Sequence, residues 1–228
     1  FGIISSLFYG TIQSALFTLL AVYATSMNFT ILEISVVTFL LAVSGAVAQF
    51  PIGKLSDVYD RRKVIVISTF GASIFAILAI LVSRQMYLPD GLATSKTWFY
   101  IFFILFSFCS LPMFSLILAH TNDNISKDKF VAAGAGLQFI FGLGAMSGPF
   151  LCSVFMDLVG SNGFFIFLFF FHAIIGFFGI YRMTVRKTVE NPDSQFVAMP
   201  QTITPAGIEL NPTTEPIEEP EKNIESKI

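Results

Sequence analysis

Charged residues are scarce in this sequence, where they make up 12% of 228 residues against 54% that are hydrophobic. Soluble globular domains carry about 25% charged residues, so the composition excludes an ordinary soluble domain. Charge is absent altogether from Phe1 to Leu32, and roughly 20 apolar residues already suffice for a helix to cross a bilayer. We therefore predict an integral membrane protein surrounded by the lipid bilayer.

Cysteine and catalytic motifs are nearly absent as well. The two cysteines, Cys109 and Cys152, both lie inside apolar stretches, so they predict no disulfide framework. The sequence shows no cluster of metal-binding residues, no glycine-rich phosphate loop and no nucleotide or nucleic-acid motif. We expect neither a metal nor another cofactor, no nucleic-acid partner, and no enzymatic or ATP-driven activity.

What the sequence does contain is a series of charge-free stretches, separated by short polar or glycine- and proline-bearing joints. They run over residues 1–32, 34–53, 64–83, 97–122, 130–156 and 158–181. Each is long enough to span a bilayer as a helix. The sequence therefore predicts an all-α membrane domain of six transmembrane helices over residues 1–182.

The character of the chain changes after residue 182. Eight acids stand against two lysines after Thr188, and prolines recur at Pro192, Pro200, Pro205, Pro212, Pro216 and Pro220. Such a composition buries too little apolar surface to offset the entropy lost on ordering. We predict a disordered, acidic, proline-rich cytoplasmic tail over residues 183–228, which is either simply solvated or a partner-binding or regulatory segment.

The basic residues favour one side of the predicted membrane domain. Only Arg84 and Lys96 lie on one side. The other side collects Lys54, Arg61, Arg62, Lys63, Lys127, Lys129, Arg182, Arg186 and Lys187. Because cytoplasmic loops are the ones enriched in Lys and Arg, both ends of the chain are predicted to be cytoplasmic.

The joint between the second and third stretches, GKLSDVYDRRK, holds six charges in eleven residues. Asp57 lies one helical turn after Gly53, and the basic pair Arg61 and Arg62 lies one turn later. Gly53 would let a neighbouring helix approach closely. Asp57 could meet Arg61 or the positive N-terminal end of an adjacent helix. We predict a conformational latch made of these four residues; the alternative is that the basic residues only fix the topology.

This joint resembles the signature between the second and third helices in each half of major facilitator superfamily (MFS) transporters, Gly-x-x-x-Asp-basic-x-Gly-basic-basic. The matching positions are Gly53, Leu55, Asp57, Arg61 and Arg62. The departures are Val58, where a basic residue is usual, and Asp60, where glycine is usual. Further along, AHTNDNISKDKFVAAGAGLQFIFGLGAMSGPF resembles the loop and eleventh helix of a bacterial branch whose substrates are mostly undefined.

The resemblance implies a twelve-helix carrier made of two six-helix halves, of which this chain matches the C-terminal half. It implies secondary active transport of a small-molecule substrate by alternating access in a bacterial inner membrane, with an N-terminal half preceding Phe1. The first and fourth spans would line the cavity, the second and fifth would pack against the other half, and the third and sixth would face lipid. Because none of the six stretches holds an Asp, Glu, Lys or Arg, a coupling carboxylate would lie in the other half.

Polar residues in the first and fourth stretches are the candidates for substrate contact. Ser5, Tyr9 and Gln13 recur every four residues and so share one helix face. Weaker candidates are Tyr100, Ser107, Ser110 and Met113, and Pro112 is expected to kink the same helix. We predict that these residues line a substrate cavity; hydrogen bonds between neighbouring helices are the alternative.

The fifth stretch carries Gly144-x-x-x-Gly148 followed by Pro149, a spacing that allows close backbone packing. We predict that these three residues serve helix packing, either static or at an interface that rocks during transport. The same pattern occurs in the fifth helix of drug/proton antiporters, so the N-terminal half of such an antiporter is the alternative. The paired glycines expected next are replaced by Cys152 and Ser153, which ranks that alternative lower.

The sixth stretch contains eight phenylalanines between residues 164 and 178, and one histidine, His172. We predict that the phenylalanines form a lipid-facing wall and that His172 is neutral and hydrogen-bonded, with proton handling as the alternative. Ser147 lies at a similar depth on the preceding stretch, so a Ser147 and His172 dyad of a rhomboid-type intramembrane serine protease is a further alternative. Ala145 replaces the first glycine of that family's Gly-x-Ser-Gly motif, which argues against it.

Overall fold

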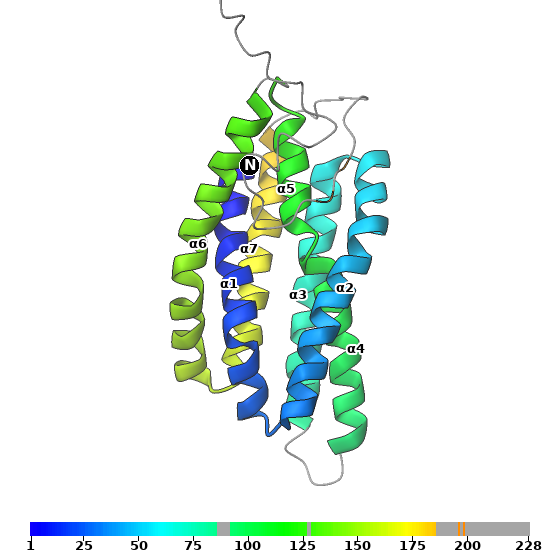
Figure 1. Cartoon of the computed structure of the whole chain (residues 1–228), viewed down its shortest axis with the longest axis vertical. Helices are drawn as coiled ribbons and strands as arrows, with labels where there is room; N and C mark the ends of the chain where they lie inside the picture. The colour runs from blue at the N-terminus through cyan, green and yellow to red at the C-terminus, as the bar shows by residue number, and fades with distance from the viewer. Residues whose placement is uncertain (86–91, 127–128, 186–195, 197, 199–228) are drawn as a thin grey trace, which may run out of the picture.

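The computed structural model describes residues 1–85, 92–126, 129–185, 196 and 198. Within these residues it consists mainly of α-helices joined by short connections, without a β-strand (Figure 1). The helices are α1 (Gly2–Ser26), α2 (Ile31–Val58), α3 (Arg61–Gln85), α4 (Leu92–Ser110), α5 (Met113–Asn122), α6 (Phe130–Val159) and α7 (Gly163–Val185). The predicted all-α fold is confirmed.

The described residues contain six helical segments that are long and apolar enough to cross a membrane. Helices α4 and α5 together supply one of them, Ser95–Asn122, and each of the other helices supplies one. The six predicted spans are therefore confirmed, and the chain is a multi-pass integral membrane protein. Helix α7 continues to Val185; beyond it only residues 196 and 198 are described, so the predicted disorder of the tail falls outside the described residues.

Pro112 causes the break between α4 and α5. Pro112 has no N–H to donate, and its ring obstructs the turn before it. Helix α4 accordingly ends at Ser110 and α5 begins at Met113, which confirms the predicted kink. Tyr9 of α1 donates its hydroxyl hydrogen to the Leu111 carbonyl at this break, over 3.1 Å.

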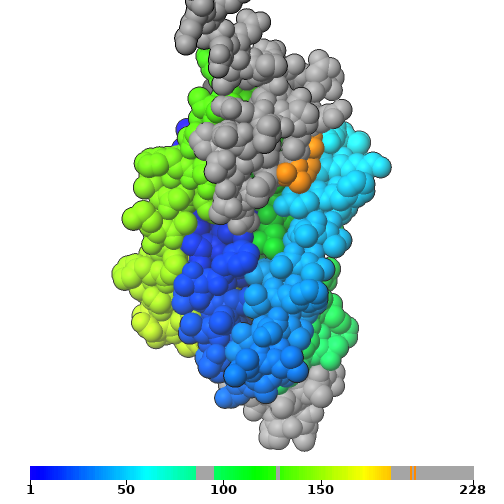
Figure 2. Space-filling view, in the orientation of Figure 1, coloured from blue at the N-terminus to red at the C-terminus, as the bar shows by residue number. Residues whose placement is uncertain are grey.

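Helix α1 lies at the centre of one side of the bundle, between α6 and α7, while α3 packs against α7 and α4, and α2 lies along α4. Helices α6, α1 and α2 share the face turned toward the viewer in Figure 2. Helices α2 and α6 expose large apolar side chains: Phe39 is 65% exposed, Phe50 78%, Met146 80% and Phe150 70%. These two helices therefore have the most surface left for lipid or for another membrane segment.

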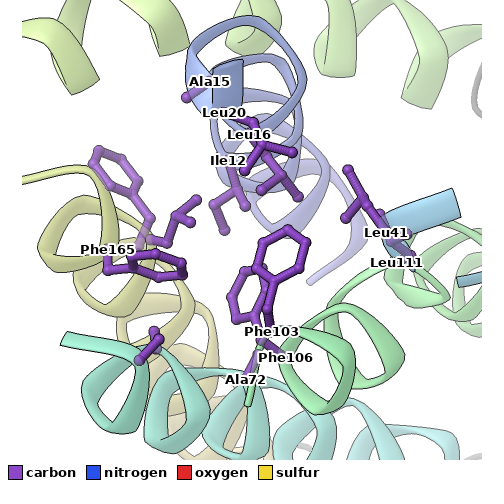
Figure 3. Packing of buried hydrophobic residues seen from close by; sticks show 14 of the residues in the cluster. Ile12, Ala15, Leu16, Leu20, Leu41, Ala72, Phe103, Phe106, Leu111 and Phe165 are labelled. Carbon is purple, nitrogen blue, oxygen red and sulfur yellow. The ribbon is translucent and has the colours of Figure 1, made fainter. Parts of the chain in front are cut away.

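The interior of the bundle is apolar and largely aromatic. Figure 3 shows Ile12 and Leu16 of α1 pointing toward Phe103 of α4, and all three are fully buried. Phe165 of α7 joins them and meets the ring of Tyr23 edge-on, with the ring centroids 5.1 Å apart. Burial of this kind holds α1, α4 and α7 together by close packing of side chains.

The predicted lipid-facing wall of phenylalanines on α7 is wrong for much of the helix. Phe170 and Phe177 are 47% and 65% exposed. Four others are buried in the bundle: Phe164, Phe165, Phe167 and Phe171. The physical reason is that α7 is packed against α3, α1 and α6, so only a narrow strip of its circumference is left for lipid.

An ion pair joins α2 and α4 at the end of the bundle far from Phe1. Thr30 and Glu33 form a capping box at the start of α2, in which each accepts a hydrogen bond from the backbone N–H of the other. Glu33 also accepts from Lys96 Nζ of α4 at 2.6 Å. Glu33 thus serves both to start α2 and to fix it against α4.

Candidate functional site

The candidate site lies at the other end of the bundle, where α2 gives way to α3. Tyr59 closes α2 in an extended conformation, with φ −112° and ψ 160°. Asp60 then accepts a hydrogen bond from the Arg62 N–H at 3.0 Å, and it accepts two more from the Arg62 guanidinium, the shorter at 3.1 Å. An acidic residue is favourable at this position because the N-terminus of a helix carries partial positive charge.

This geometry accounts for the departure from the family signature at Asp60. Among the described residues, Asn28 alone of the non-glycine residues has a positive φ. The backbone at Asp60 therefore needs no glycine, and the carboxylate caps α3 instead.

Arg61 is the centre of the site. Its Nη2 lies 3.2 Å from Asp57 Oδ1 on α2, and its Nε lies 3.2 Å from Asp123 Oδ2, just past the end of α5. The side chain of Arg61 is 6% exposed, against 12% for Asp123 and 35% for Asp57. One buried guanidinium thus ties three helices together through charge-assisted contacts.

Sequence reasoning brought together Gly53, Asp57, Arg61 and Arg62, and the structure places all four at this junction. Gly53 is buried one turn before Asp57. Asp123 was missed. The signal that could have found it is its position, because it is the first charged residue after a charge-free stretch and ends that stretch on the same side of the membrane domain.

The polar residues of α1 lie inside the bundle in this structure. Ser5 and Tyr9 are fully buried and Gln13 is 3% exposed. Tyr9 reaches the α4–α5 break, as described above, whereas Ser5 Oγ has no hydrogen-bond partner among the described residues. Their contact with a substrate stays a prediction.

The candidates on α4 and α5 are similarly placed. Ser107 donates to the Phe103 carbonyl of its own helix at 2.7 Å, and Met113 is fully buried. Tyr100 is half-buried. Ser110 turns toward α7 and meets His172. A role for these four residues in lining a cavity also stays a prediction.

His172 is fully buried and bound at both ring nitrogens. Its Nδ1 lies 2.7 Å from the Leu168 carbonyl, so this nitrogen carries the proton. Its Nε2 then accepts from the Ser110 hydroxyl at 2.9 Å. His172 is therefore hydrogen-bonded, as predicted, and its neutral charge stays a prediction.

The protease alternative required Ser147 to pair with His172, and the structure contradicts this. Ser147 Oγ donates to the Gly144 carbonyl of its own helix at 2.8 Å and lies 3.4 Å from Thr11 Oγ1. Similar depth in the membrane did not bring Ser147 and His172 together, because the two side chains point toward different neighbours.

The Ser110 and His172 contact yields a prediction on stability. Ser110→Ala is expected to lower the free energy of unfolding by about 1–2 kcal/mol, since Nε2 of a buried histidine loses its donor. The matched control is Ser107→Ala on the same helix, whose hydroxyl serves only its own backbone and should matter little. Denaturation of the purified protein in mixed detergent micelles measures both. Equal losses of unfolding free energy in Ser110→Ala and Ser107→Ala would show that the contact with His172 does not stabilise the protein.

Two glycines of α6, Gly144 and Gly148, face α1. A Cβ added at Gly144 would collide with the Leu7 carbonyl oxygen, and one added at Gly148 would collide with the Thr11 carbonyl oxygen. Gly10 on α1 faces the Phe141 carbonyl oxygen of α6 in the same way. Glycine is therefore required at these positions for the two backbones to approach. Pro149 lies inside α6 without ending it.

The comparisons with known proteins agree with this arrangement. A family model described as the Major Facilitator Superfamily matches residues 2–214. An uncharacterized MFS-type transporter from Yersinia enterocolitica is 26% identical over 198 residues, which are 87% of this chain and 47% of that protein. The uncharacterized MFS-type transporter YfkF from Bacillus subtilis is 26% identical over 165 residues, 70% of this chain and 38% of that protein. No solved structure matches the chain.

The chain thus spans about half the length, or less, of these curated relatives. The family model nevertheless covers nearly all of the chain, including the six spans and the junction at Arg61. The resemblance read from the joint between the second and third spans is confirmed, and the chain belongs to the Major Facilitator Superfamily.

Proposed function

We propose that this chain forms one six-helix half of a permease that moves a small solute across the membrane by alternating access. The observation that carries the proposal is the family match over residues 2–214, in a chain whose described residues hold six spans and which covers 47% of a relative named as a transporter. In such carriers two halves rock against each other around a central site.

The exposed faces of α2 and α6 support this proposal. They present large apolar side chains such as Phe39, Phe50 and Met146, which suits contact with a second six-helix half as well as with lipid. Such a half is the partner that the second and fifth spans would need. The basic residues at the Arg61 end of the bundle favour placing that end in the cytoplasm, in the inner membrane if the host is bacterial.

The Arg61 junction would act as the latch of the rocking motion. Its contacts join residues of α2, α3 and the end of α5, so sliding or tilting one helix against the others would break them. An ion pair that exists in one conformation and is absent in the other biases the equilibrium between the two. No Asp, Glu, Lys or Arg lies at the middle of a described span, so coupling to a proton or another ion through such a side chain would depend on the other half.

A transport assay tests the proposal. The full-length protein that contains this chain would be reconstituted into liposomes, and small solutes of several classes would be offered under an imposed pH or sodium gradient. Gradient-driven flux of at least one solute is expected. Failure of every solute class to move in either direction would count against transport.

Asp57→Asn probes the latch in the same assay. The change is expected to slow transport about tenfold, because the charge-assisted contact with Arg61 is weakened, while membrane insertion stays intact because Asp57 lies at the end of α2. The matched control is Lys63→Gln, which changes an exposed charge in the first turn of α3. Wild-type rates in Asp57→Asn would reject the latch.

The second candidate is the N-terminal half of a drug/proton antiporter, which Gly144, Gly148 and Pro149 favour. On that alternative the acidic tail would be the central loop, and six further spans would follow it. Sequencing the open reading frame on both sides of this segment separates the two alternatives. Six spans upstream support a C-terminal half of a permease, and six spans downstream support the N-terminal half of an antiporter.

A further inference from the structure

One aromatic residue beyond α7 contacts the latch. Between residues 186 and 228 the sequence contains one aromatic side chain, Phe196. The structure places it against the Arg61 end of α2, where residues 196 and 198 are drawn in orange in Figure 2. Phe196 is half-buried and packs against the apolar core, whereas Ala198 is exposed.

Two contacts hold Phe196 in place, and both are made to residues of the latch. The ring lies on Gly53: the three atoms nearest to a Cβ added at Gly53 all belong to the Phe196 ring. The backbone N–H of Phe196 donates to Asp57 Oδ1 at 2.6 Å. Gly53 and Asp57 are one helical turn apart, so ring and N–H bind the same face of α2.

The oxygen that receives the Phe196 N–H is the same Oδ1 that faces Arg61 Nη2 at 3.2 Å. Asp57, at 35%, is the more exposed of the two carboxylates that Arg61 bridges. A donor added on this exposed side stabilises the carboxylate in the position that Arg61 requires. The Phe196 N–H and the Arg61 guanidinium therefore share one acceptor atom, and both favour the charged carboxylate in this orientation.

We infer that Phe196 anchors a clasp, in which its ring and backbone N–H bind the Gly53 and Asp57 face of α2 and hold the latch in its assembled state. The occupant of this face is Phe196 of the same chain. Gly53 is needed because any larger residue would displace the ring. The consequence for transport rests on the proposed function: release of the clasp would ease the opening of the latch and shift the carrier toward its other conformation.

Amide hydrogen exchange on the full-length protein in detergent or nanodiscs tests the clasp. In Phe196→Ala, exchange at the residue 196 amide and across residues 53–60 is expected to rise about tenfold, because the charge-assisted contact and its packing are lost. The matched control is Ala198→Ser, which changes an exposed residue of the same segment and should leave both unchanged. An unprotected residue 196 amide in the wild-type protein, or unchanged exchange at residues 53–60 in Phe196→Ala, would overturn the inference.

A double-mutant cycle tests the specific contact. Gly53→Ala is expected to raise exchange at residues 53–60 about as much as Phe196→Ala does, since the new methyl group displaces the ring. Adding Gly53→Ala to Phe196→Ala should then have little further effect, because no ring is left to displace. Equal increments in both backgrounds would show that Gly53 acts through another helix, and the clasp would be rejected.

These measurements need no substrate. A protein that shows the expected exchange pattern but moves no solute would refute the proposed function and leave the clasp standing. A protein that transports normally but shows no coupling between Gly53 and Phe196 would refute the clasp alone.

Discussion

Arg61→Gln is expected to lower the free energy of unfolding by about 3 kcal/mol, because it removes one member of a buried ion-pair group and leaves carboxylates behind. Asp123, with a side chain 12% exposed, would lose its guanidinium partner in a place where water screens it poorly. Asp57, at 35%, would lose less. Denaturation of the purified protein in mixed detergent micelles measures the change.

Three variants decide whether this loss comes from the buried charges. Lys63→Gln removes an exposed charge two residues away and should change stability by less than about 0.5 kcal/mol. Arg61→Lys keeps the charge without the planar fork that reaches two carboxylates, so an intermediate loss is expected. Adding Asp123→Asn to Arg61→Gln should restore part of the stability, because the carboxylate that faced Arg61 is then replaced by a neutral amide. A loss in Arg61→Gln no larger than in Lys63→Gln would contradict the structure of the junction.

The six spans could be predicted because the bilayer leaves few choices. A hydrocarbon core admits long apolar helices with their backbone groups satisfied internally, so the charge-free stretches marked the helices directly. The break at Pro112 could also be predicted, since its cause lies in one residue. The contact between Asp57 and Arg61 was also predicted, but the expected reason, one helical turn between them, was wrong: α2 ends at Val58, Tyr59 is extended and α3 begins at Arg61.

The contacts between distant segments could not be predicted from the sequence. Asp123 meets Arg61 only because α5 ends beside the start of α3, and no local pattern encodes that. His172 was paired with Ser147 on the basis of depth, but depth does not fix the direction in which a side chain points around its helix. Ser110 lies in that direction instead.

Which phenylalanines of α7 are buried could not be predicted from the sequence either. In a soluble protein an apolar face points inward, but in a membrane both lipid and protein interior favour Phe. Composition therefore could not tell the buried Phe165 from the exposed Phe177. Only the packing of α7 among α1, α3 and α6 decides it.

Replacing Gly144 and Gly148 together by alanine is expected to destabilise the protein by about 2–6 kcal/mol, from roughly 1–3 kcal/mol for each overpacked position. Each new methyl group would meet a backbone carbonyl oxygen of α1, that of Leu7 or of Thr11. A backbone atom cannot rotate away as a side chain does, so α6 would have to move off α1 along its length. Unfolding in mixed micelles gives the loss of free energy.

Gly136→Ala on the same helix supplies the matched control. A Cβ at Gly136 would meet nothing within 4 Å in the described part of the chain, and alanine favours a helix over glycine by up to about 1 kcal/mol. The control should therefore be neutral or slightly stabilising, opposite in sign to the effect of replacing Gly144 and Gly148.

The same variants separate the two roles considered for Gly144 and Gly148. If the pair forms a static contact, stability falls by the amount above. If the alanine pair instead leaves stability unchanged and slows transport, the glycines serve an interface that moves, and the α1 contact seen here belongs to only one of the carrier's conformations.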